Sequence, residues 1–452
     1  MPNDFAYVAL ILWPFISVLF YKHMPIVQAT FWTIVGGFLF LPVKTAIDFP
    51  FVPPLNKESI PVIAALVGCK YIKKVKVTLI PRTGVERWLI LVVIITPFFT
   101  MLNNQESFNG IPGLTLHDTI SAVINQYLKV LPFVIGVQLI NTYKDQILLF
   151  KLLVLACLIY SIPILFEVRM SPQLHTWMYG FFPHSWVQQY RADGFRPVVF
   201  MGHGLIVSMF VAVSLAAATI TWKEKMRIYG VPAFVIVIYF FVLLILCKTL
   251  GAFILGTILL VFIGFERPSW TRWLSAFLIF IVVFYPLLSF FNLFPHDYLI
   301  QLAADFDKSR GGSLAFRFYH EEALLNHAIE KTFFGWGAWG RFRLEDSVTD
   351  GYWIITLGQY GIIGFGSFFG LSVLAVWRGL KANKISARNE QPRFFVSHIL
   401  IVSIIMIDQL PNHSLYSWLW LYIGALLGVS NYILKENDSN KNRKTSSILG
   451  GN

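Results

Sequence analysis

Charged residues are scarce in this chain. Asp, Glu, Lys and Arg make up 13% of its 452 residues, whereas hydrophobic residues make up 56%. A soluble domain usually carries about a quarter charged residues, so this composition excludes an ordinary soluble protein. The shortage of charge leaves long apolar runs, which need lipid or a protein interior around them.

Cysteine is rarer still, and internal repeats are absent. Cys69, Cys157 and Cys247 lie in or beside apolar segments at unrelated spacings, which excludes a disulfide framework and a cysteine-based metal site. The lack of a repeat of about 20–50 residues disfavours the internally repeated folds of many transporters. Residues 5–20 lack a basic leader and a small-residue cleavage site, so we expect them to remain as a membrane span.

The apolar runs predict helices. Backbone in lipid must satisfy its own hydrogen bonds, and these runs lack the alternation of barrel strands. We therefore predict an all-α, polytopic membrane helix bundle of 12–13 transmembrane helices over residues 1–434, followed by a disordered cytoplasmic tail over 435–452. The expected spans are 5–21, 26–43, 58–72, 87–102, 119–140, 146–166, 197–220, 229–247, 249–265, 272–292, 352–377, 394–411 and 414–434.

Basic residues are shared unevenly between alternate loops. From residue 70 onward, one set of loops and the tail carries 22 Lys and Arg residues and the opposite set carries 10. The richer set is cytoplasmic by the positive-inside rule. The opposite side then faces the periplasm or the exterior and holds two long loops, 167–196 and the large loop 293–351. Membrane orientation thus accounts for the net charge of +12, and we expect no nucleic-acid partner.

The first long loop ends with two arginines. Arg191 and Arg196 precede His203 at the head of the next expected span. Planar guanidinium groups bind phosphate oxygens in a bidentate way, so these side chains suit a phosphate or pyrophosphate at the outer membrane surface. Contact with lipid headgroups, or pairing of an arginine with Asp193, explains them equally well.

The large loop contains an expected helix over residues 313–332. Arg317 and Glu321 stand four residues apart on it, so a surface ion pair is the simplest explanation of both. The functional alternative places Arg317 and His320 on a helix edge that faces a substrate. Arg341 and Arg343 follow in the same loop, and we expect them to contribute to anion binding.

Two motifs in the large loop point toward cofactors and are set aside. Asp305 and Asp307 have the acidic spacing that many sugar transferases use for a divalent cation, but two carboxylates in a polar loop are common by chance. The glycines of 335–340 match a dinucleotide-binding pattern without the strand and helix that such a site requires. We therefore expect neither a metal nor another cofactor.

Two acidic residues lie where the chain meets the membrane. Asp350 comes directly before an expected span, where it can cap the helix or accept a proton from a hydroxyl group. Asp408 lies near the end of an apolar segment, where a carboxylate is costly unless it is paired. We expect Asp408 to hold an arginine of the large loop in position.

Several of these segments resemble one bacterial family. Arg317 with its helix, residues 334–337 and the stretch 350–364 (DGYWIITLGQYGIIG) resemble the O-antigen ligase and polysaccharide polymerase superfamily of inner-membrane proteins. Arg196 with residues 202–204 resembles the entry to an upstream span, and residues 408–412 resemble a motif near the last helices. The likeness covers most of residues 87–434 in layout.

The resemblance implies a GT-C-like membrane glycosyltransferase of the bacterial inner membrane that uses undecaprenyl-diphosphate sugars on the periplasmic side. Ligases of this family usually carry a His-Asn pair where this chain has Asp350-Gly351, which favours a polymerase. We predict transfer of a glycan, with inversion, from an undecaprenyl-diphosphate-linked oligosaccharide to a sugar hydroxyl on a second lipid-linked unit. The predicted diphosphate ligands are Arg191, Arg196, Arg317, Arg341 and Arg343; the predicted base is Asp350 or His320, with His203 and Asp408 in support.

Fixed guanidinium groups stabilise a departing diphosphate without a metal. The expected partners are membrane lipid and proteins that regulate chain length or export the polysaccharide. The nearest rival is a ligase that moves a finished glycan to lipid A core or to protein. A lipid-linked sugar flippase or another transporter is the alternative of a different class, and the concentration of ionisable residues in one external loop disfavours it.

Overall fold

The computed structural model describes residues 1–49, 52–191, 194–265, 267–386 and 392–449. In these ranges, eight helices are long and apolar enough to cross a membrane, which confirms a multi-pass helical membrane protein. They are α1 (Asp4–His23), α5 (Val85–Leu102), α6 (Leu116–Leu139), α7 (Tyr143–Met170), α9 (Gly204–Lys223), α12 (Pro268–Phe290), α15 (Tyr352–Ser386) and α17 (Ser417–Leu449).

Shorter helices fill the other expected spans. A helix of 14 residues rises about 21 Å, which is less than the ~30 Å hydrocarbon core of a bilayer. The total of 12–13 spans therefore stays a prediction. These shorter elements are α2 (Ile26–Phe31), the π-helix η1 (Trp32–Gly36), α3 (Gly37–Phe40), α4 (Ser59–Val67), the π-helix η2 (Gly68–Ile72), α10 (Ala233–Leu246), α11 (Leu250–Gly264) and α16 (Pro392–Asp408).

Capping residues determine where two of the helices start. Thr115 and Asp118 form a reciprocal capping box at the start of α6, in which each side chain accepts from the backbone N–H of the other residue. Thr142 and Asp145 repeat this arrangement at α7. Such boxes satisfy backbone donors that a helix leaves free at its first turn.

Close backbone approach packs α17 against α6 in the centre of the bundle. A Cβ atom built on Gly424 would lie 2.2 Å from the Phe133 carbonyl oxygen, and one on Gly136 would lie 2.6 Å from that of Leu421. Small residues stabilise membrane helix pairs in this way because they let the backbones come close. Helix α9, rich in Ala and Ser, is almost wholly buried beside α7, α10 and α11.

Two expected spans begin later than predicted, and two small hairpins interrupt the all-α pattern. Residues 197–203 are not helical because the buried Glu167 carboxylate accepts the N–H groups of Val198 and Val199, at 2.8 and 2.7 Å. The hairpin of β3 (Arg227–Ile228) and β4 (Val231–Pro232) precedes α10, and that of β1 (Ala46–Phe49) and β2 (Val52–Asn56) precedes α4.

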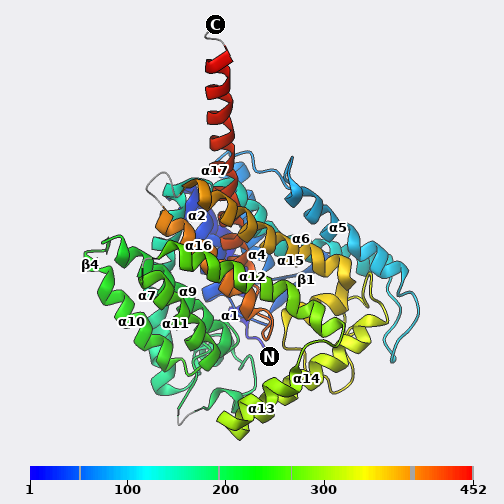
Figure 1. Cartoon of the computed structure of the whole chain (residues 1–452). Helices are drawn as coiled ribbons and strands as arrows, with labels where there is room; N and C mark the ends of the chain where they lie inside the picture. The colour runs from blue at the N-terminus through cyan, green and yellow to red at the C-terminus, as the bar shows by residue number, and fades with distance from the viewer. Residues whose placement is uncertain (50–51, 192–193, 266, 387–391, 450–452) are drawn as a thin grey trace.

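The C-terminal segment differs from the predicted disordered tail. Helix α17 continues past residue 435 to Leu449 and projects from the bundle (Figure 1). Adding residues to an existing helix costs far less than starting one. The packed first half of α17 therefore nucleates a helix that the polar composition of residues 435–449 does not predict.

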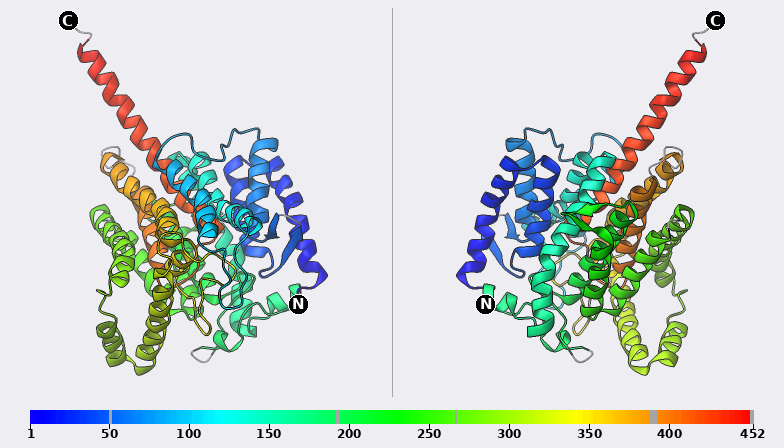
Figure 2. Two further views of the ribbon diagram at one scale, coloured as in Figure 1. Left: turned by 90° about the vertical axis from the view of Figure 1, so that its right-hand side faces the viewer. Right: turned by 90° about the vertical axis from the view of Figure 1, so that its left-hand side faces the viewer.

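Both long loops lie at the end of the molecule opposite this projection (Figures 1 and 2). The large loop folds as a helical hairpin of α13 (His296–Phe306) and α14 (Lys308–Ile329), so the expected helix over 313–332 begins earlier than predicted. The other loop contains α8 (Leu174–Tyr179) and the 3-10 turn η3 (Val187–Gln189). The N-terminus lies at the same end, where the Asn3 N–H donates to the Tyr179 carbonyl at 3.0 Å.

Candidate functional site

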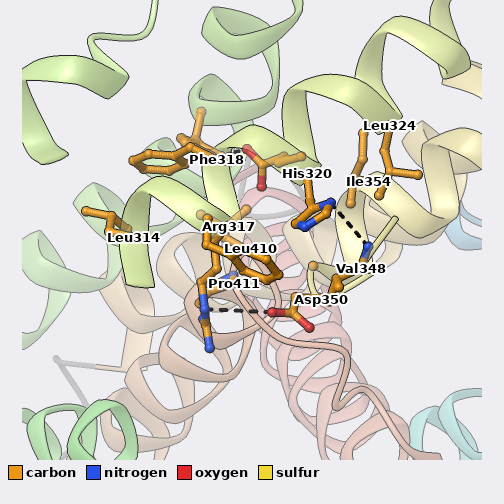
Figure 3. Close-up of a pocket in the computed structure, with 14 residues that line it drawn as sticks. Leu314, Arg317, Phe318, His320, Leu324, Val348, Asp350, Ile354, Leu410 and Pro411 are labelled. Carbon is orange, nitrogen blue, oxygen red and sulfur yellow. Dashed lines mark hydrogen bonds and ion pairs between the residues drawn. The ribbon is translucent and has the colours of Figure 1, made fainter. Parts of the chain in front are cut away.

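A cavity of about 240 Å³ opens beneath α14. Its walls come from α12, α14, the start of α15 and the turn after α16, and they are mostly apolar (Figure 3). We call it the first cavity. The polar side chains that line it are Tyr285, Arg317, His320, Glu321 and Asp350.

An ion pair between Arg317 and Asp350 crosses the first cavity. The Arg317 Nε lies 3.7 Å from the Asp350 Oδ2, and the two side chains are 38% and 45% exposed. Figure 3 shows both reaching toward the turn at Leu410 and Pro411. Such an accessible pair contributes little to stability, so both groups remain open to a ligand. Arg317 therefore does not form the ion pair with Glu321 that its spacing suggests.

The backbone next to Asp350 packs closely against the turn after α16. A Cβ atom on Gly351 would lie 2.3 Å from the Leu410 carbonyl oxygen, so glycine lets the start of α15 pack against this turn. The Tyr352 N–H donates to the carbonyls of Gln409 and Asn412, at 3.0 and 3.1 Å. This first donor of α15 is satisfied without the Asp350 carboxylate, which weakens the capping explanation.

His320 also lines the first cavity, and its hydrogen bond to the backbone limits what it can do there. Its Nδ1 accepts a hydrogen bond from the Val348 N–H at 3.4 Å (Figure 3). A neutral imidazole with Nδ1 as acceptor carries its proton on Nε2. His320 is then suited to donating a hydrogen bond and poorly suited to removing a proton, so Asp350 is the better base of the predicted pair.

Glu321 is a site residue that the sequence prediction missed. Its Oε1 accepts from the Tyr285 hydroxyl and its Oε2 from the Trp353 Nε1, the latter at 3.1 Å. Burial raises the pKa of Glu321 to about 7. The carboxyl group thus joins α14 to α12 and α15 one turn from Arg317, in the wall of the first cavity. Its i+4 spacing from Arg317 suggested a surface pair and concealed this role.

A second cavity of about 460 Å³ lies on the other side of Asp350. Its wall combines the loops before α4 and α9 with the turn after α16, and it is more polar than the first. Asp350 lines both cavities. Molecules bound in the first and in the second cavity can therefore both contact the Asp350 carboxylate.

Arg196 is buried near this junction. Its Nε donates to the Thr249 hydroxyl at 3.0 Å, and its side chain packs on Gly204, where a Cβ would lie 2.5 Å from the Arg196 Cδ. Burial lowers the pKa of Arg196 to about 10, and the charges of Arg191 and Arg317 add to this effect. Arg196 stays charged at neutral pH, and no carboxylate among the described residues forms an ion pair with it.

His203 stabilises the start of α9 and faces the second cavity. Its Nδ1 accepts from the Leu205 N–H at 3.0 Å, and its ring lies 4.5 Å from that of His184. Burial, followed by the charge of Arg196, lowers the pKa of His203 to about 3. The predicted supporting residue is thus a neutral helix cap.

The structure separates Arg341 from the other predicted anion ligands. Arg341 is 2% exposed, and its guanidinium donates to the carbonyls of Glu106, Ile111 and Pro112, at 3.0, 3.3 and 2.9 Å. It lines neither cavity. A buried guanidinium committed to three carbonyls stabilises a loop, and the diphosphate role predicted for it has no support here.

Arg343 and Arg191 are exposed at the margins of the site. Arg343 lies over the Phe342 ring at 5.2 Å and acts electrostatically on His413 in the second cavity. Arg191 acts in the same way on Arg196 and His203. Asp193, the proposed partner of Arg191 or Arg196, lies outside the described residues.

Asp408 organises the turn after α16. Its carboxylate accepts from the Ser414 hydroxyl at 2.6 Å and from the Asn412 side-chain amide at 2.8 Å. Arg317 is close enough to act on it electrostatically. Asp408 therefore positions a turn that carries Leu410 and Pro411 into the first cavity, and its predicted arginine contact is indirect.

One member of the acidic pair Asp305 and Asp307 has local contacts. Asp307 accepts from the Ser309 N–H at 2.8 Å as the cap of α14 and pairs with Arg310 at 3.5 Å. Across the part of the chain that the structure describes, no group of three or more His, Cys, Asp or Glu residues is arranged to hold a metal ion. Asp307 thus has a structural role that explains it without a cation.

Comparison with protein-family models gives no match, and comparison with curated proteins gives none either. The resemblance to the ligase and polymerase superfamily therefore stays a prediction.

Proposed function

We propose that this protein is a membrane glycosyltransferase that lengthens a bacterial surface polysaccharide. It transfers glycan from undecaprenyl diphosphate to a hydroxyl of a second lipid-linked repeat unit, at the outer face of the inner membrane. The observation that carries this proposal is the Arg317–Asp350 pair at the junction of an apolar and a polar cavity.

The donor fits the first cavity and Arg317 in its wall. The apolar walls suit the first isoprene units of a polyprenyl chain, and Arg317 lies where the chain meets polar surroundings. Arg196 adds a second fixed positive charge close enough to interact with Arg317. Two such charges stabilise the negative charge that develops on a departing diphosphate.

Asp350 completes the transfer step. The acceptor oxygen forms a bond to the anomeric carbon while the bond from that carbon to the diphosphate oxygen breaks, and the electron pair leaves with the diphosphate. The acceptor O–H bond breaks and its proton passes to Asp350. Attack from the side opposite the leaving group inverts the anomeric carbon, so a single carboxylate suffices.

Purified protein in liposomes tests this proposal directly. Given undecaprenyl-diphosphate-linked repeat units, it should produce a ladder of longer glycans, resolved by gel or mass spectrometry. We expect Arg196→Ala and Arg317→Ala each to slow lengthening at least ~100-fold, as loss of a transition-state charge contact does. Arg310→Ala is the matched control because Arg310 lies on the same helix, exposed and paired with Asp307.

Three other outcomes would replace the proposal. If both arginine variants lengthen glycans at the normal rate, the site assignment is wrong. If glycan moves to lipid A core or to protein instead of a second repeat unit, the protein is a ligase. If vesicles move lipid-linked sugar across the bilayer without forming a glycosidic bond, it is a transporter.

A further inference from the structure

The second cavity has features that the transfer step does not use. Its volume of about 460 Å³ lies in the ~300–1,000 Å³ range of small-molecule sites. Its wall includes two lysines, Lys44 and Lys57, and three histidines, His184, His203 and His413. Asp350 and Glu58 are its acidic residues, so the basic side chains outnumber the acidic ones.

Lys57 is a buried cation in this wall. It is 6% exposed, its Nζ donates to the Phe200 carbonyl at 2.8 Å, and it lies over the Phe38 ring at 5.0 Å. Burial lowers the pKa of Lys57 to about 7, and Glu58 opposes this shift only in part. An anion bound in the cavity would favour the charged ammonium, because an opposite charge at close range offsets desolvation.

The two acidic residues are already engaged. Asp350 pairs with Arg317, and a Glu58 oxygen accepts from the Ser417 N–H at 3.1 Å. Glu58 also interacts electrostatically with Lys57 and with Lys129 of α6. Lys44 is exposed at the cavity wall and acts on His184. Each acidic residue of the wall therefore has a cation other than the two lysines near it, Arg317 for Asp350 and Lys129 for Glu58, which leaves Lys44 and Lys57 to interact with a bound anion.

The histidines of this wall are neutral. Burial lowers the pKa of His203 to about 3 and that of His413 to about 4, with neighbouring cations adding to the effect. Neutral imidazoles donate and accept hydrogen bonds, as sugar hydroxyls do. The Asn412 and Ser414 side chains in the same wall add further polar atoms.

We propose that the second cavity is the acceptor subsite and that Lys57 and Lys44 select an acceptor sugar that bears a carboxylate, such as a hexuronic acid. The assignment of this cavity to the acceptor rests on the proposed function, in which the adjoining residue Asp350 is the base. A carboxylate is favoured over the donor diphosphate because no arginine among the described residues lines the second cavity, whereas Arg317, whose guanidinium suits bidentate contact with a diphosphate, lines the first.

Direct binding of two small probes tests the inference without any transfer reaction. Saturation-transfer NMR on the full chain in nanodiscs would compare methyl β-D-glucuronide with methyl β-D-glucoside. We expect the glucuronide to bind at least ~10-fold more tightly, a difference that a single charge contact of about 1.4 kcal/mol provides. Lys57→Met should reduce this preference at least fivefold and leave glucoside binding unchanged.

Two further variants distinguish a loss of binding from a folding defect. Lys44→Met changes an exposed residue of the wall and should also weaken glucuronide binding. Lys70→Met is the control, because Lys70 is exposed on η2 and lines neither cavity. Equal binding of the two probes, or a preference that survives both wall variants, would overturn the inference.

The donor site is tested separately with farnesyl diphosphate. Arg317→Ala should weaken binding of farnesyl diphosphate much more than binding of the glucuronide, which it affects only by freeing the Asp350 carboxylate in the wall of the second cavity. If inorganic pyrophosphate displaces the glucuronide at the concentration at which it displaces farnesyl diphosphate, the second cavity belongs to the donor and the inference fails. If the probes behave as expected but no glycan is lengthened, the proposed function fails and the carboxylate site remains.

Discussion

Arg317 and Arg341 come from the same loop, yet their surroundings differ completely. Arg317 is 38% exposed, faces a cavity and has a carboxylate 3.7 Å away. Arg341 is 2% exposed and donates to three backbone carbonyls. A guanidinium with free donors beside a cavity can bind a substrate, whereas one whose donors are used by the backbone can only hold the fold. Residue type and loop therefore do not decide the role.

Replacing Arg341 should give the largest effect, and the effect should be on stability. Arg341→Met removes three hydrogen bonds to carbonyls of partly exposed loop residues, and a typical hydrogen bond contributes about 1 kcal/mol. We expect a loss of about 3 kcal/mol, seen as a marked fall in the unfolding temperature in detergent. Lengthening activity per folded molecule should stay within about threefold of normal. A stable but inactive Arg341→Met protein would place this arginine at the substrate after all.

Replacing Arg317 should lower activity and leave stability nearly unchanged. Arg317→Lys keeps the charge but loses the fork that can contact Asp350 and a phosphate oxygen together. We expect turnover to fall by about 10–100-fold, which corresponds to about 1.4–2.7 kcal/mol, with an unfolding temperature close to normal. Arg310→Lys on the same helix is the control and should change neither quantity. If Arg317→Lys instead lowers stability as much as Arg341→Met does, the contrast between the two residues disappears.

The difference between these arginines shows where sequence reasoning stops. Long apolar runs predicted the membrane helices, and the Thr and Asp spacings account for the starts of α6 and α7, because those signals are local. The partners of Arg341 lie about 230 residues earlier in the chain, and no local pattern indicates them. The resemblance placed Arg317 and Asp350 in one site, but only the fold shows that Asp350 borders two cavities.

Glu321 illustrates the same limit. Its partners Tyr285 and Trp353 come from α12 and α15, over 30 residues away on either side. The sequence offered Arg317 as the nearer partner, and the i+4 rule favoured it. Tertiary packing overrode that preference by burying Glu321 against aromatic donors and by turning Arg317 toward Asp350.

Glu321 also predicts how stability depends on pH. Its folded pKa of about 7 exceeds the ordinary value of 4.5, so ionisation opposes folding. Its contribution to stability is complete below about pH 4.5 and is lost as the pH rises to about 7. Glu321→Gln cannot ionise but keeps an oxygen for Trp353 and a polar group for Tyr285. We expect the variant to be more stable than the normal protein at pH 8, by on the order of 2 kcal/mol, and about equally stable near pH 5.

Thermal unfolding in detergent at both pH values measures this difference. Glu322→Gln, one residue along α14, is the matched control and should show no such pH dependence. An unfolding temperature for Glu321→Gln that falls equally at pH 5 and pH 8 would mean that the carboxylate is ionised and needed in the folded protein. The hydrogen bonds from Tyr285 and Trp353 to α14 would then be charge-assisted.

His320 should give the smallest effect, although it lines the same cavity as Arg317. Its Nδ1 accepts from Val348 and leaves only a donor for a ligand, so His320→Gln, which also accepts and donates, should slow lengthening less than about fivefold. A general base contributes about 100-fold or more, and Asp350→Asn should show a loss of that size. The sizes of the two losses separate the residues. If His320→Gln slows lengthening as much as Asp350→Asn does, then His320 is the base and the carboxylate only holds Arg317.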